Sequence, residues 1–466
     1  MHMGGIIEQA GESSGSSDQE RLDRIFRAYD IRGLVPEELN ADIARDIARA
    51  FADTLPDGIV AVGRDMRTDS EQLATAFIDG LIQQGREVLD VGMITSDMIS
   101  FTVGQYDLAG GAMITASHNP GEYDGIKLTA AGVSPVGIDS GLLEIKQAVI
   151  DQSFHKVEEV GRKLEKNILS DWVEHALRFA GSELKPLKVG IDAGNGMGAL
   201  AVPKLQELTP LDISGLYMEL DGTFPNHPAN PILPEAIEDL QTLVRRNELD
   251  LGIAFDGDGD RCFVVDETGE AVTSSEFGAL LAATFLKENE HACVVYNAVI
   301  GDIVPETVEG LGGKAIRSKV GHTYVQEQMR SSNAVFGCEG AGHFFFRDNF
   351  FADSGLIAAV MVLGIMSETD KKLSELIGPY KKYAHIVEED IKTNQGEHLI
   401  AALKQHYSQM KCDELDGLTI RAEDWWANIR PSNTEPYVRI NLEAKNRTVL
   451  TKAHQELSSL VKKFTA

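Results

Sequence analysis

A strand–helix–strand pattern that occurs three times along the chain is the feature that most constrains its fold. In the first copy, "GIVAVGRD" predicts a buried strand, "SEQLATAFIDGLIQQG" a helix, and "REVLDVG" a return strand. The three strand pairs cover residues 58–65 and 86–92, 187–196 and 211–217, and 292–298 and 314–321. Each gap is long enough for a crossover helix and too long for a hairpin, so parallel α/β units are expected. Repetition favours three related domains, although buried strands of any α/β protein resemble one another.

The C-terminal segment has a different pattern. "HLIAALKQHYSQM" predicts a helix, the region around "WWANIRPSNTEPYVRI" predicts strands joined by turns, and "TVLTKAHQELSSLVKKF" predicts a closing helix. A chain of 466 residues is long enough for several domains. The expected division is a disordered tail at 1–20, three α/β domains at 21–165, 166–268 and 269–385, and an α+β domain at 386–466.

Composition narrows the range of partners. The net charge of −29 argues against nucleic acid and anionic membranes, so an anionic ligand would need local basic residues. No apolar run reaches the roughly 18 residues of a membrane span, and the N-terminus does not resemble a signal peptide. The four cysteines are far apart and form no CxxC pair. This usage is typical of a reduced, cytoplasmic protein without zinc.

The stretch "GGAMITASHNPGEYDGIK" ends an apolar strand on a serine beside a histidine. Ser117 is thereby expected at the carboxyl end of a strand, where open α/β sheets bind ligands. A serine hydroxyl can attack phosphorus or carry a phosphoryl group. The surrounding T-A-S-H-N is not the G-x-S-x-G of hydrolases, which argues against acyl chemistry. Alone, the motif is also compatible with a plain cap or turn.

The stretch "LGIAFDGDGDRCFVVDETG" places three carboxylates at alternate positions. Asp256, Asp258 and Asp260 would repel one another without a cation, and oxygen ligands suit Mg²⁺ or Ca²⁺. The flanking segments predict strands, and Arg261 stands where an EF-hand loop needs glycine, so an EF-hand is rejected. A solvated acidic turn is the simpler alternative. Arg261 beside the triplet favours the arrival of a second anion such as phosphate.

Two further motifs supply ligand-binding chemistry. "IRPSNTEPYVRI" gathers two guanidinium groups, hydroxyls and turn amides around one loop, which is typical of a phosphate cradle, unless it is only a surface turn. "FGCEGAGHFFFRD" places Glu339 and His343 around small residues, where a carboxylate can accept hydrogen bonds from sugar hydroxyls; "HFFF" also reads as a core strand. Other basic candidates, each compatible with a surface role, are Arg27, Arg32, Lys127 and His322.

Taken in order, "FRAYDIRG", "TASHNP", "DGDGDR", "CEGAGH" and "RPSNTEP" resemble the α-D-phosphohexomutase family over residues 26–439. The resemblance implies four domains around a central active-site cleft, three of them similar α/β units. It implies that Ser117 carries a phosphoryl group, and that Ser117 and the aspartate triplet bind Mg²⁺. The catalytic positions implied are Ser117, His118, Lys127, Arg32, Arg261 and His343. The substrate-binding positions implied are Tyr29, His322, Glu339, Gly340, Ala341, Arg430, Ser432, Asn433, Thr434 and Arg439.

The implied reaction interconverts hexose 6-phosphate and hexose 1-phosphate through a phosphoserine enzyme and a hexose 1,6-bisphosphate, which also acts as activator. Lys127 or His343 would be the general acid/base. Mannose is the favoured sugar, with glucose second, and the enzyme is expected in the cytoplasm as a monomer or homodimer. The alternatives are a phosphoglucomutase or phosphoglucosamine mutase of the same family, a non-catalytic phosphosugar-binding protein, and a metal-dependent phosphatase.

The chain departs from the family pattern at several positions. Asp124 stands where the family usually has asparagine, and Ala341 replaces the usual serine of the sugar loop, which removes one hydroxyl donor. Some relatives have a lysine in the segment that matches "YNAVIGD", and this chain has none. Asn433 stands where phosphoglucosamine-specific relatives typically have glycine. The last difference favours mannose or glucose.

Overall fold

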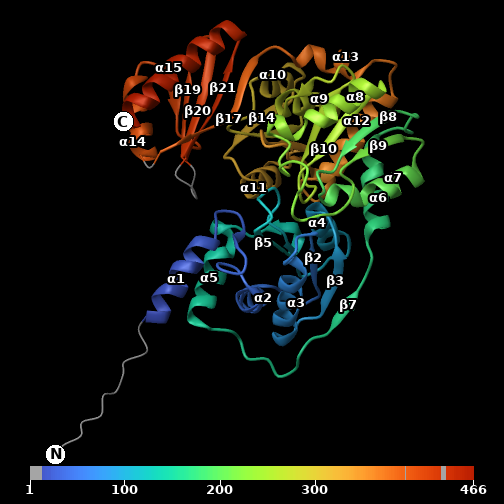
Figure 1. Ribbon diagram of the computed structural model, residues 1–466, viewed down its shortest axis with the longest axis vertical. Coiled ribbons are helices and arrows are strands. Elements are labelled where there is room, and N and C mark those ends of the chain that lie inside the picture. The colour runs from blue at the N-terminus through green and yellow to red at the C-terminus, as the bar shows by residue number, and fades with distance from the viewer. Residues whose placement is uncertain (1–12, 394, 432–436, 466) are drawn as a thin grey trace, which may run out of the picture.

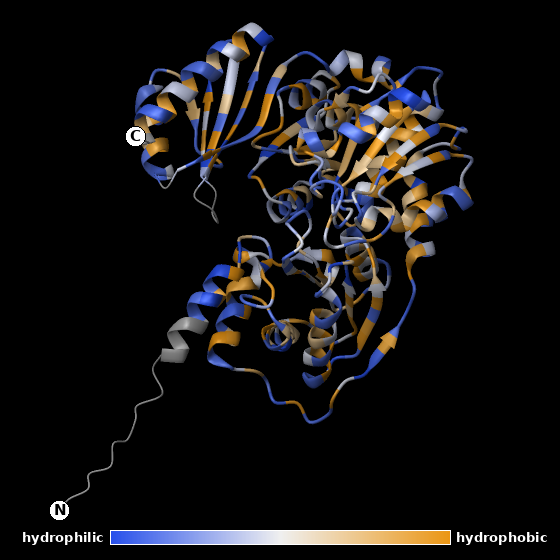
Figure 2. Ribbon diagram, viewed as in Figure 1, coloured by the Kyte–Doolittle hydropathy of each residue, from blue (hydrophilic) through white to orange (hydrophobic). Residues whose placement is uncertain are grey.

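The computed structural model describes residues 13–393, 395–431 and 437–465, and the expected sites at Ser432, Asn433 and Thr434 lie outside these ranges. Four β-sheets follow one another along the chain. Figure 1 shows domain 1, the first α/β unit (blue to teal-green), beneath domains 2 and 3 (green to orange), with domain 4 (red) at one side. Figure 2 shows hydrophobic residues concentrated in the strands and polar residues on the outer helices. No helix within the described ranges is long and apolar enough to cross a membrane.

Domain 1 contains one mixed sheet between helices. Its strands lie in the order β1-β5-β4-β2-β3-β7, with β6 on β5. The strands are β1 Ile31–Leu34, β2 Val60–Arg64, β3 Val88–Met93, β4 Gly110–Ile114, β5 Tyr123–Ala130, β6 Ser134–Pro135 and β7 Lys163–Glu165. The helices are α1 Ser13–Ile25, α2 Ala41–Thr54, α3 Ser70–Gln83, α4 Ser96–Gln105 and α5 Leu143–Asp151.

Domains 2 and 3 have smaller sheets, ordered β12-β11-β10-β8-β9 and β14-β13-β15-β16. Domain 2 contains β8 Lys188–Asp192, β9 Asp212–Leu216, β10 Leu251–Phe255, β11 Cys262–Asp266, β12 Ala271–Val272, α6 Leu169–Leu177, α7 Val202–Leu208 and α8 Glu238–Asn247. Domain 3 contains β13 Cys293–Asn297, β14 Lys314–Ser318, β15 Phe336–Cys338, β16 Phe344–Phe346, α9 Ser274–Glu288, α10 Ile303–Gly310, α11 His322–Ser332, α12 Gly355–Ser367 and α13 Leu373–Ile377.

The three α/β domains share one topology. In each, a central strand pairs in parallel with the two strands that follow it, and the last of these turns back into an antiparallel partner. The equivalent orders are β3-β2-β4-β5, β9-β8-β10-β11 and β14-β13-β15-β16. The predicted repeat of three similar α/β units is therefore confirmed.

The antiparallel turn of each repeat carries a different predicted motif. The loop between β4 and β5 contains Ser117, the loop between β10 and β11 contains the aspartate triplet, and the loop between β15 and β16 contains Glu339 and His343. Each loop leaves the carboxyl end of a parallel strand, where ligand sites form in such sheets. "HFFF" does supply a fully buried core strand, β16, as the simpler interpretation had it, and His343 directly precedes that strand.

Domain 4 is an antiparallel sheet, as the α+β prediction required. Its order is β17-β21-β20-β19-β18. Its elements are β17 Ala384–Lys392, α14 Gly396–His406, β18 Lys411–Asp413, β19 Leu418–Arg421, β20 Trp425–Pro431, β21 Tyr437–Ala444 and α15 Arg447–Thr465. Arg430 and Arg439 face each other in the β20–β21 register.

The tail expected at 1–20 overlaps the beginning of helix α1, which starts at Ser13. The buried anchors of this helix, Leu22 and Ile25, lie in the core of domain 1 and within the domain expected from residue 21. Residues 1–12 lie outside the described ranges.

Helix α12 joins the cores of domains 2 and 3. Ser354 caps its N-terminus by accepting a hydrogen bond from the backbone N–H of Ile357, and nearly all of its 13 residues are buried. At Gly364, a Cβ atom would lie 1.9 Å from the carbonyl oxygen of Ala180. The backbone of another segment therefore fills the space that a side chain would occupy.

We expect Gly364→Ala to destabilise the protein by roughly 1–3 kcal/mol because the new methyl group must displace backbone. Helix propensity alone predicts the opposite sign, a gain of about 1 kcal/mol. The matched control is Gly310→Ala on α10, whose Cβ would have no atom within 4 Å. Urea unfolding of both variants measures the difference, and an equal or higher midpoint for Gly364→Ala would contradict the packing argument.

Candidate active site

The aspartate triplet forms a compact, buried cluster on the β10–β11 hairpin. One carboxylate oxygen from each of Asp256, Asp258 and Asp260 lies within 4.8 Å of the others. The three residues are between 0% and 4% exposed. One oxygen of Asp258 and one of Asp260 have no hydrogen-bond partner among the described residues. Buried carboxylates with unsatisfied oxygens are a donor set that fits a hard divalent cation such as Mg²⁺.

Ser117 of domain 1 lies directly against this cluster. Its Oγ donates a hydrogen bond to Asp256 Oδ2 at 2.9 Å and lies 3.2 Å from His118 Nδ1. Ser117 has φ +51°, in the left-handed region that non-glycine residues seldom adopt. The Ser117 and Asp256 loops, 139 residues apart in sequence, thus meet in the fold.

Domain 1 also supplies a cation to the triplet. Lys127 Nζ, on β5, lies 2.6 Å from both Asp258 Oδ2 and Asp260 Oδ2. Ser96, at the start of α4, donates its hydroxyl to the Asp258 carboxylate, and its N–H donates to the Asp258 carbonyl. Lys127 therefore balances buried negative charge and ties domain 1 to domain 2.

The pKa values in the cluster follow from burial and crowding. Burial, followed by the neighbouring carboxylates Asp258 and Asp260, raises the pKa of Asp256 well above its usual range. Burial also tends to raise the pKa of Asp258 and of Asp260, but Lys127 contributes enough to make both net shifts downward. Burial lowers the pKa of Lys127, and the two carboxylates outweigh it, so its net shift is upward. The ammonium form of Lys127 is thus strongly favoured in this arrangement.

Domain 3 contributes a histidine and a glutamate. His343 Nε2 lies 3.4 Å from Asp260 Oδ1, and its Nδ1 lies 3.4 Å from Glu339 Oε2. Arg261 approaches the same ring, with Nε 3.3 Å from His343 Nε2, and lies 3.4 Å from Asp256 Oδ2. Glu339 accepts hydrogen bonds from Asn297 Nδ2 at 2.9 Å and Gly321 N at 2.8 Å. The structure thus brings these predicted residues together.

Two acids of this region, the buried Asp97 and the partly buried Asp353, were missed by the sequence analysis. Asp353 Oδ2 lies 3.8 Å from His343 Nε2, and burial raises its pKa to about 7. Asp97 accepts hydrogen bonds from Thr95 and Ser354, and burial raises its pKa to about 7. Asp353 immediately precedes the helix-capping Ser354, and that N-cap signal could have drawn attention to it.

The first predicted motif lies along the edge between domains 1 and 3. Tyr29 Oη donates to the carbonyl of Val320 at 2.7 Å, and the Tyr29 ring packs edge-on against His322. Burial lowers the pKa of His322 to about 4, so its ring is neutral near pH 7. Arg32 hydrogen-bonds to Asn119 of the serine loop and to Asp30. Gly340 and Ala341 lie between Glu339 and His343, and both are partly exposed.

Domain 4 places one predicted arginine near this edge. Arg430 NH1 lies 3.5 Å from Asp416 Oδ2, and Asp416 Oδ2 also accepts from Val320 N at 2.7 Å. Arg430 also lowers the pKa of Tyr29, although burial dominates and the net shift is upward. Arg439 instead pairs with Asp390 at 3.2 Å on the neighbouring strand. Of the two arginines, Arg430 is the one whose charge acts on Tyr29.

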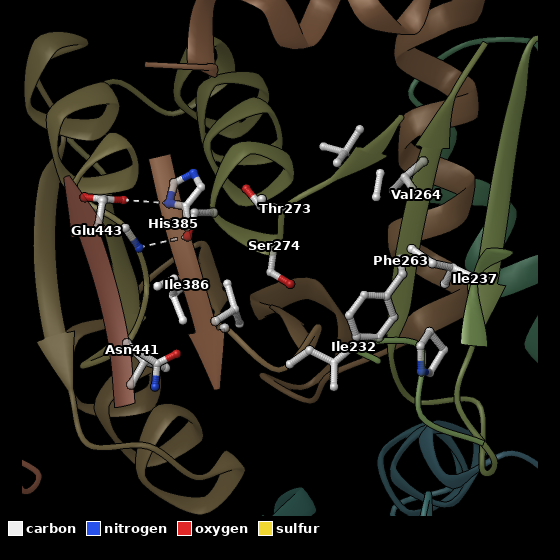
Figure 3. A pocket seen from close by; sticks show the side chains of 18 of the residues that line it. Ile232, Ile237, Phe263, Val264, Thr273, Ser274, His385, Ile386, Asn441 and Glu443 are labelled. Carbon is white, nitrogen blue, oxygen red and sulfur yellow. Dashed lines mark hydrogen bonds and ion pairs between the residues drawn. The ribbon is translucent and has the colours of Figure 1, made fainter. Parts of the chain in front are cut away.

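A separate apolar cavity of about 150 Å³ lies between domains 2, 3 and 4. Figure 3 shows Ile232, Ile237 and Phe263 on one side of it and Ile386 on the other. Gly340 is the one predicted site residue among its lining residues. Its mainly apolar lining does not suit a phosphate, so the chemistry belongs to the charged cluster instead.

Four domain families match the chain in order. They are described as phosphoglucomutase/phosphomannomutase alpha/beta/alpha domains I, II and III and C-terminal domain, matching residues 23–154, 170–269, 273–383 and 387–458.

Individual relatives match over nearly their whole length. The chain is 36% identical to a protein of Xanthomonas campestris pv. campestris named "Phosphohexose mutases", covering 94% of this chain and 99% of that protein. It is 36% identical to a phosphomannomutase of Escherichia coli, covering 91% and 98%. A crystal structure of a phosphoglucomutase/phosphomannomutase family protein from Burkholderia thailandensis superposes with a TM-score of 0.85 at 28% identity, covering 94% and 97%.

The family matches and the named relatives, together with the four-domain α/β fold, show that the chain is a phosphate-transferring mutase, an enzyme of the isomerase class. The chain belongs to the phosphoglucomutase/phosphomannomutase family.

We expect Asp258→Asn to weaken Mg²⁺ binding roughly 10-fold or more, because it removes one of the clustered negative charges. Isothermal titration of the purified protein with MgCl₂ measures this directly. Asp212→Asn, an exposed change in the same domain, is the control and should bind Mg²⁺ like the wild type. Equal affinity in Asp258→Asn would place the cation elsewhere.

Proposed function

We propose that this enzyme interconverts hexose 6-phosphate and hexose 1-phosphate, with a phosphoryl group carried on Ser117 and a hexose 1,6-bisphosphate as intermediate. Mannose is the preferred sugar and glucose the second. The observation that carries the proposal is the 2.9 Å hydrogen bond from Ser117 Oγ to Asp256. It sets a hydroxyl at the edge of a carboxylate cluster, where a phosphoryl group on that oxygen would sit beside a bound cation.

Electrostatics explains why the site needs groups from several domains. A phosphoryl group on Ser117 adds about −1.5 to −2 charge beside the three carboxylates. Lys127, Arg261 and His343 already surround the carboxylates within 4 Å. Phosphoryl transfer depends mainly on positioning and charge stabilisation, and this cluster offers both.

Asp256, Asp258, Asp260 and an oxygen on Ser117 would hold Mg²⁺. When bound, the cation supplies positive charge that stabilises the transferring phosphoryl group. Lys127 Nζ has two carboxylates at 2.6 Å, which makes it a charge-balancing group rather than a base. Its Nζ also limits the repulsion between Asp258 and Asp260 while the site loads or releases anions.

His343 is the better candidate for general acid/base catalysis. In the first half-reaction, a sugar hydroxyl forms a bond to phosphorus as the Ser117 Oγ–P bond breaks, and His343 accepts the hydroxyl proton. The bisphosphate then turns end over end, and Ser117 takes the other phosphoryl group while the proton returns to the sugar oxygen. Glu339 contacts His343 and would accept hydrogen bonds from sugar hydroxyls during both steps.

The phosphate that is not transferred is assigned to Arg430. In this structure Arg430 lies against the carboxylate of Asp416, so an arriving phosphate would replace one anionic partner with another. Arg439 has its own partner in Asp390 and is assigned a supporting role in the same loop. The sugar preference rests on Asn433, which stands where phosphoglucosamine-specific relatives typically have glycine.

Two other functions make different predictions. A binding protein without catalysis would need neither Ser117 nor the triplet, yet the structure sets them in contact. A phosphatase would let water reach the phosphorylated serine, and would release inorganic phosphate from hexose 1-phosphate instead of isomerising it. A coupled assay with mannose, glucose and glucosamine phosphates plus a trace of bisphosphate separates these functions and ranks the sugars.

We expect Ser117→Ala to lower the mutase kcat by roughly three orders of magnitude or more, because the phosphoryl group loses its carrier. The exposed Ser134→Ala change in the same domain is the control and should keep wild-type kcat. Steady-state rates with hexose 1-phosphate provide the measurement. Full turnover by Ser117→Ala would remove the serine from the mechanism.

We expect Arg430→Ala to raise KM by about 30- to 700-fold, equivalent to about 2–4 kcal/mol for a lost charge-assisted phosphate contact. A smaller loss of kcat should accompany it, since binding of the remote phosphate helps position the reacting end. Arg447→Ala, an exposed change in the same domain, is the control. An unchanged KM beside a collapsed kcat would assign Arg430 to the reacting phosphate.

A further inference from the structure

We propose that Arg67 is the positioning residue for the Ser117 loop, and that Asp65, Ser70 and Asp124 hold its guanidinium in place by sharing a proton. The inference rests on the proposed function, because it assumes that Ser117 carries the phosphoryl group. What it contributes beyond that function is the identity of the group, Arg67, that fixes the position of the serine. Arg67 belongs to none of the motifs that the sequence analysis singled out.

The Arg67 guanidinium uses all of its N–H groups, four of them on carbonyls of this loop and the fifth on Asp65. Nη2 donates to the carbonyls of Ser117 and Asn119, both at 2.7 Å. Nη1 donates to the carbonyls of Pro120 at 2.8 Å and Tyr123 at 2.9 Å, and Nε lies 3.2 Å from Asp65 Oδ2. Arginine has five such donors in a fixed fork, which lysine cannot reproduce. The Arg67 side chain is 1% exposed, so water cannot replace these contacts.

These contacts act on the backbone of the reacting residue itself. Ser117 lies in the left-handed region at φ +51°, a conformation that persists only where surrounding contacts fix it. Arg67 fixes its carbonyl, and Thr115 Oγ1 accepts a hydrogen bond from its N–H at 2.9 Å. Together they determine where Ser117 Oγ points.

Arg67 also contacts the domain that holds the triplet. Its guanidinium carbon lies 5.1 Å from the centre of the Phe224 ring in domain 2. A Cβ at Gly222 would lie 2.6 Å from the Arg67 Cα, so the two loops pack backbone to backbone. The serine loop is thereby positioned against domain 2 as well as within domain 1.

The charge on Arg67 is matched by a pair of buried acids. Asp65 is 0% exposed and Asp124 is 1% exposed. Ser70 Oγ lies 2.6 Å from Asp65 Oδ1 and 2.7 Å from Asp124 Oδ2. A hydroxyl has one proton and can donate to only one of two carboxylates, so the second contact requires a proton on a carboxyl group. Asp65 faces the guanidinium and is the ionised partner, which leaves the proton on Asp124.

The environment of Asp124 also favours a proton on its carboxyl group. The groups that face it are Asp65 and Arg67 after β2, Ser70 at the start of α3, and the N–H of Gly125. Burial, and next the charge of Asp65, raises the pKa of Asp124 to about 8. An unfolded aspartate has a pKa of about 4. The stability that this proton contributes is therefore complete below about pH 4, declines as the pH rises, and is lost above about pH 8.

The first test separates positioning from folding through Arg67→Lys and Arg67→Ala. We expect Arg67→Lys to lower kcat about 10-fold or more while KM changes less than about 3-fold, because the remote phosphate contact is untouched. For Arg67→Ala, added guanidinium chloride at millimolar concentration should restore part of kcat, and equal sodium chloride should not. Arg45→Lys, on the surface of α2, is the control and should behave as the wild type. A kcat within 2-fold of wild type for folded Arg67→Lys would overturn the proposal.

The second test does not depend on removing Arg67. Asp124→Asn supplies an amide N–H to Ser70 at every pH, so its kcat at pH 7 should match the wild type. Between pH 8 and 9.5 its unfolding midpoint and kcat should fall less than those of the wild type. Superimposable pH profiles for the two proteins, or a tenfold lower kcat for Asp124→Asn at pH 7, would overturn the proton-sharing network.

Hydrogen exchange distinguishes a failure of this inference from a failure of the proposed function. Faster exchange of the amides at 115–125 in Arg67→Lys than in Arg45→Lys is expected whatever the reaction is, and equal exchange would overturn the positioning role. If the wild-type protein shows no mutase activity while the two variants still differ in exchange, the proposed function is refuted and the positioning role of Arg67 is not.

Discussion

The buried negative charge of the aspartate triplet is the constraint on which the rest of this structure depends. Three carboxylates with at most 4% exposure cannot stay ionised together unless cations surround them. Domain 1 supplies the cation Lys127, the hairpin itself supplies Arg261, and domain 3 supplies His343, whose ring adds positive charge when it is protonated. The groups that surround this one carboxylate cluster therefore come from three domains, which meet at the cluster. It also explains how a chain with a net charge of −29 can receive an anion at this place.

The repeat architecture makes this convergence possible. The same antiparallel turn carries a serine in domain 1, carboxylates in domain 2 and a histidine with a glutamate in domain 3. The fold thus provides three equivalent positions, and the sequence has given each a different chemical role. The central strands of the repeats also have related buried groups at their carboxyl ends: Asp65 directly after β2, Asp192 as the last residue of β8 and Asn297 as the last residue of β13. Asp65 supports Arg67, and Asn297 supports Glu339.

Much of the fold could be predicted because the pattern of buried strands and crossover helices is regular. All six strands of the three pairs are present, as are the helices expected in domain 4. The equivalence of the three motif-bearing turns was not foreseen. Strand β15 has only three residues, too few for a periodic signal, and β10 was recognised only as the flank of the triplet. The start of α1 was missed because its apolar anchors follow a run of small polar residues.

The site was predictable where residues of one chemical type cluster in sequence. The triplet stands out for that reason, whereas Ser117 stands out because an apolar strand ends on it, and the structure sets the two in contact. Arg67 and Asp353 could not be found in this way. The serine-loop carbonyls that Arg67 binds are 50 or more residues away from it, and strand β16 separates Asp353 from His343 in the sequence. Lys127 was expected as an acid/base candidate, and its two carboxylate contacts make charge balance the better assignment.

The most direct test of the central claim is a phosphoryl transfer measured in a single turnover. Enzyme is incubated with hexose 1,6-bisphosphate labelled in its phosphates, freed of ligand, and mapped by mass spectrometry before and after mixing with unlabelled mannose 1-phosphate. The account predicts label on the peptide containing Ser117, and transfer of that label to newly formed bisphosphate at a rate at least equal to kcat. Label on another residue, or its release as inorganic phosphate without bisphosphate formation, would contradict the account.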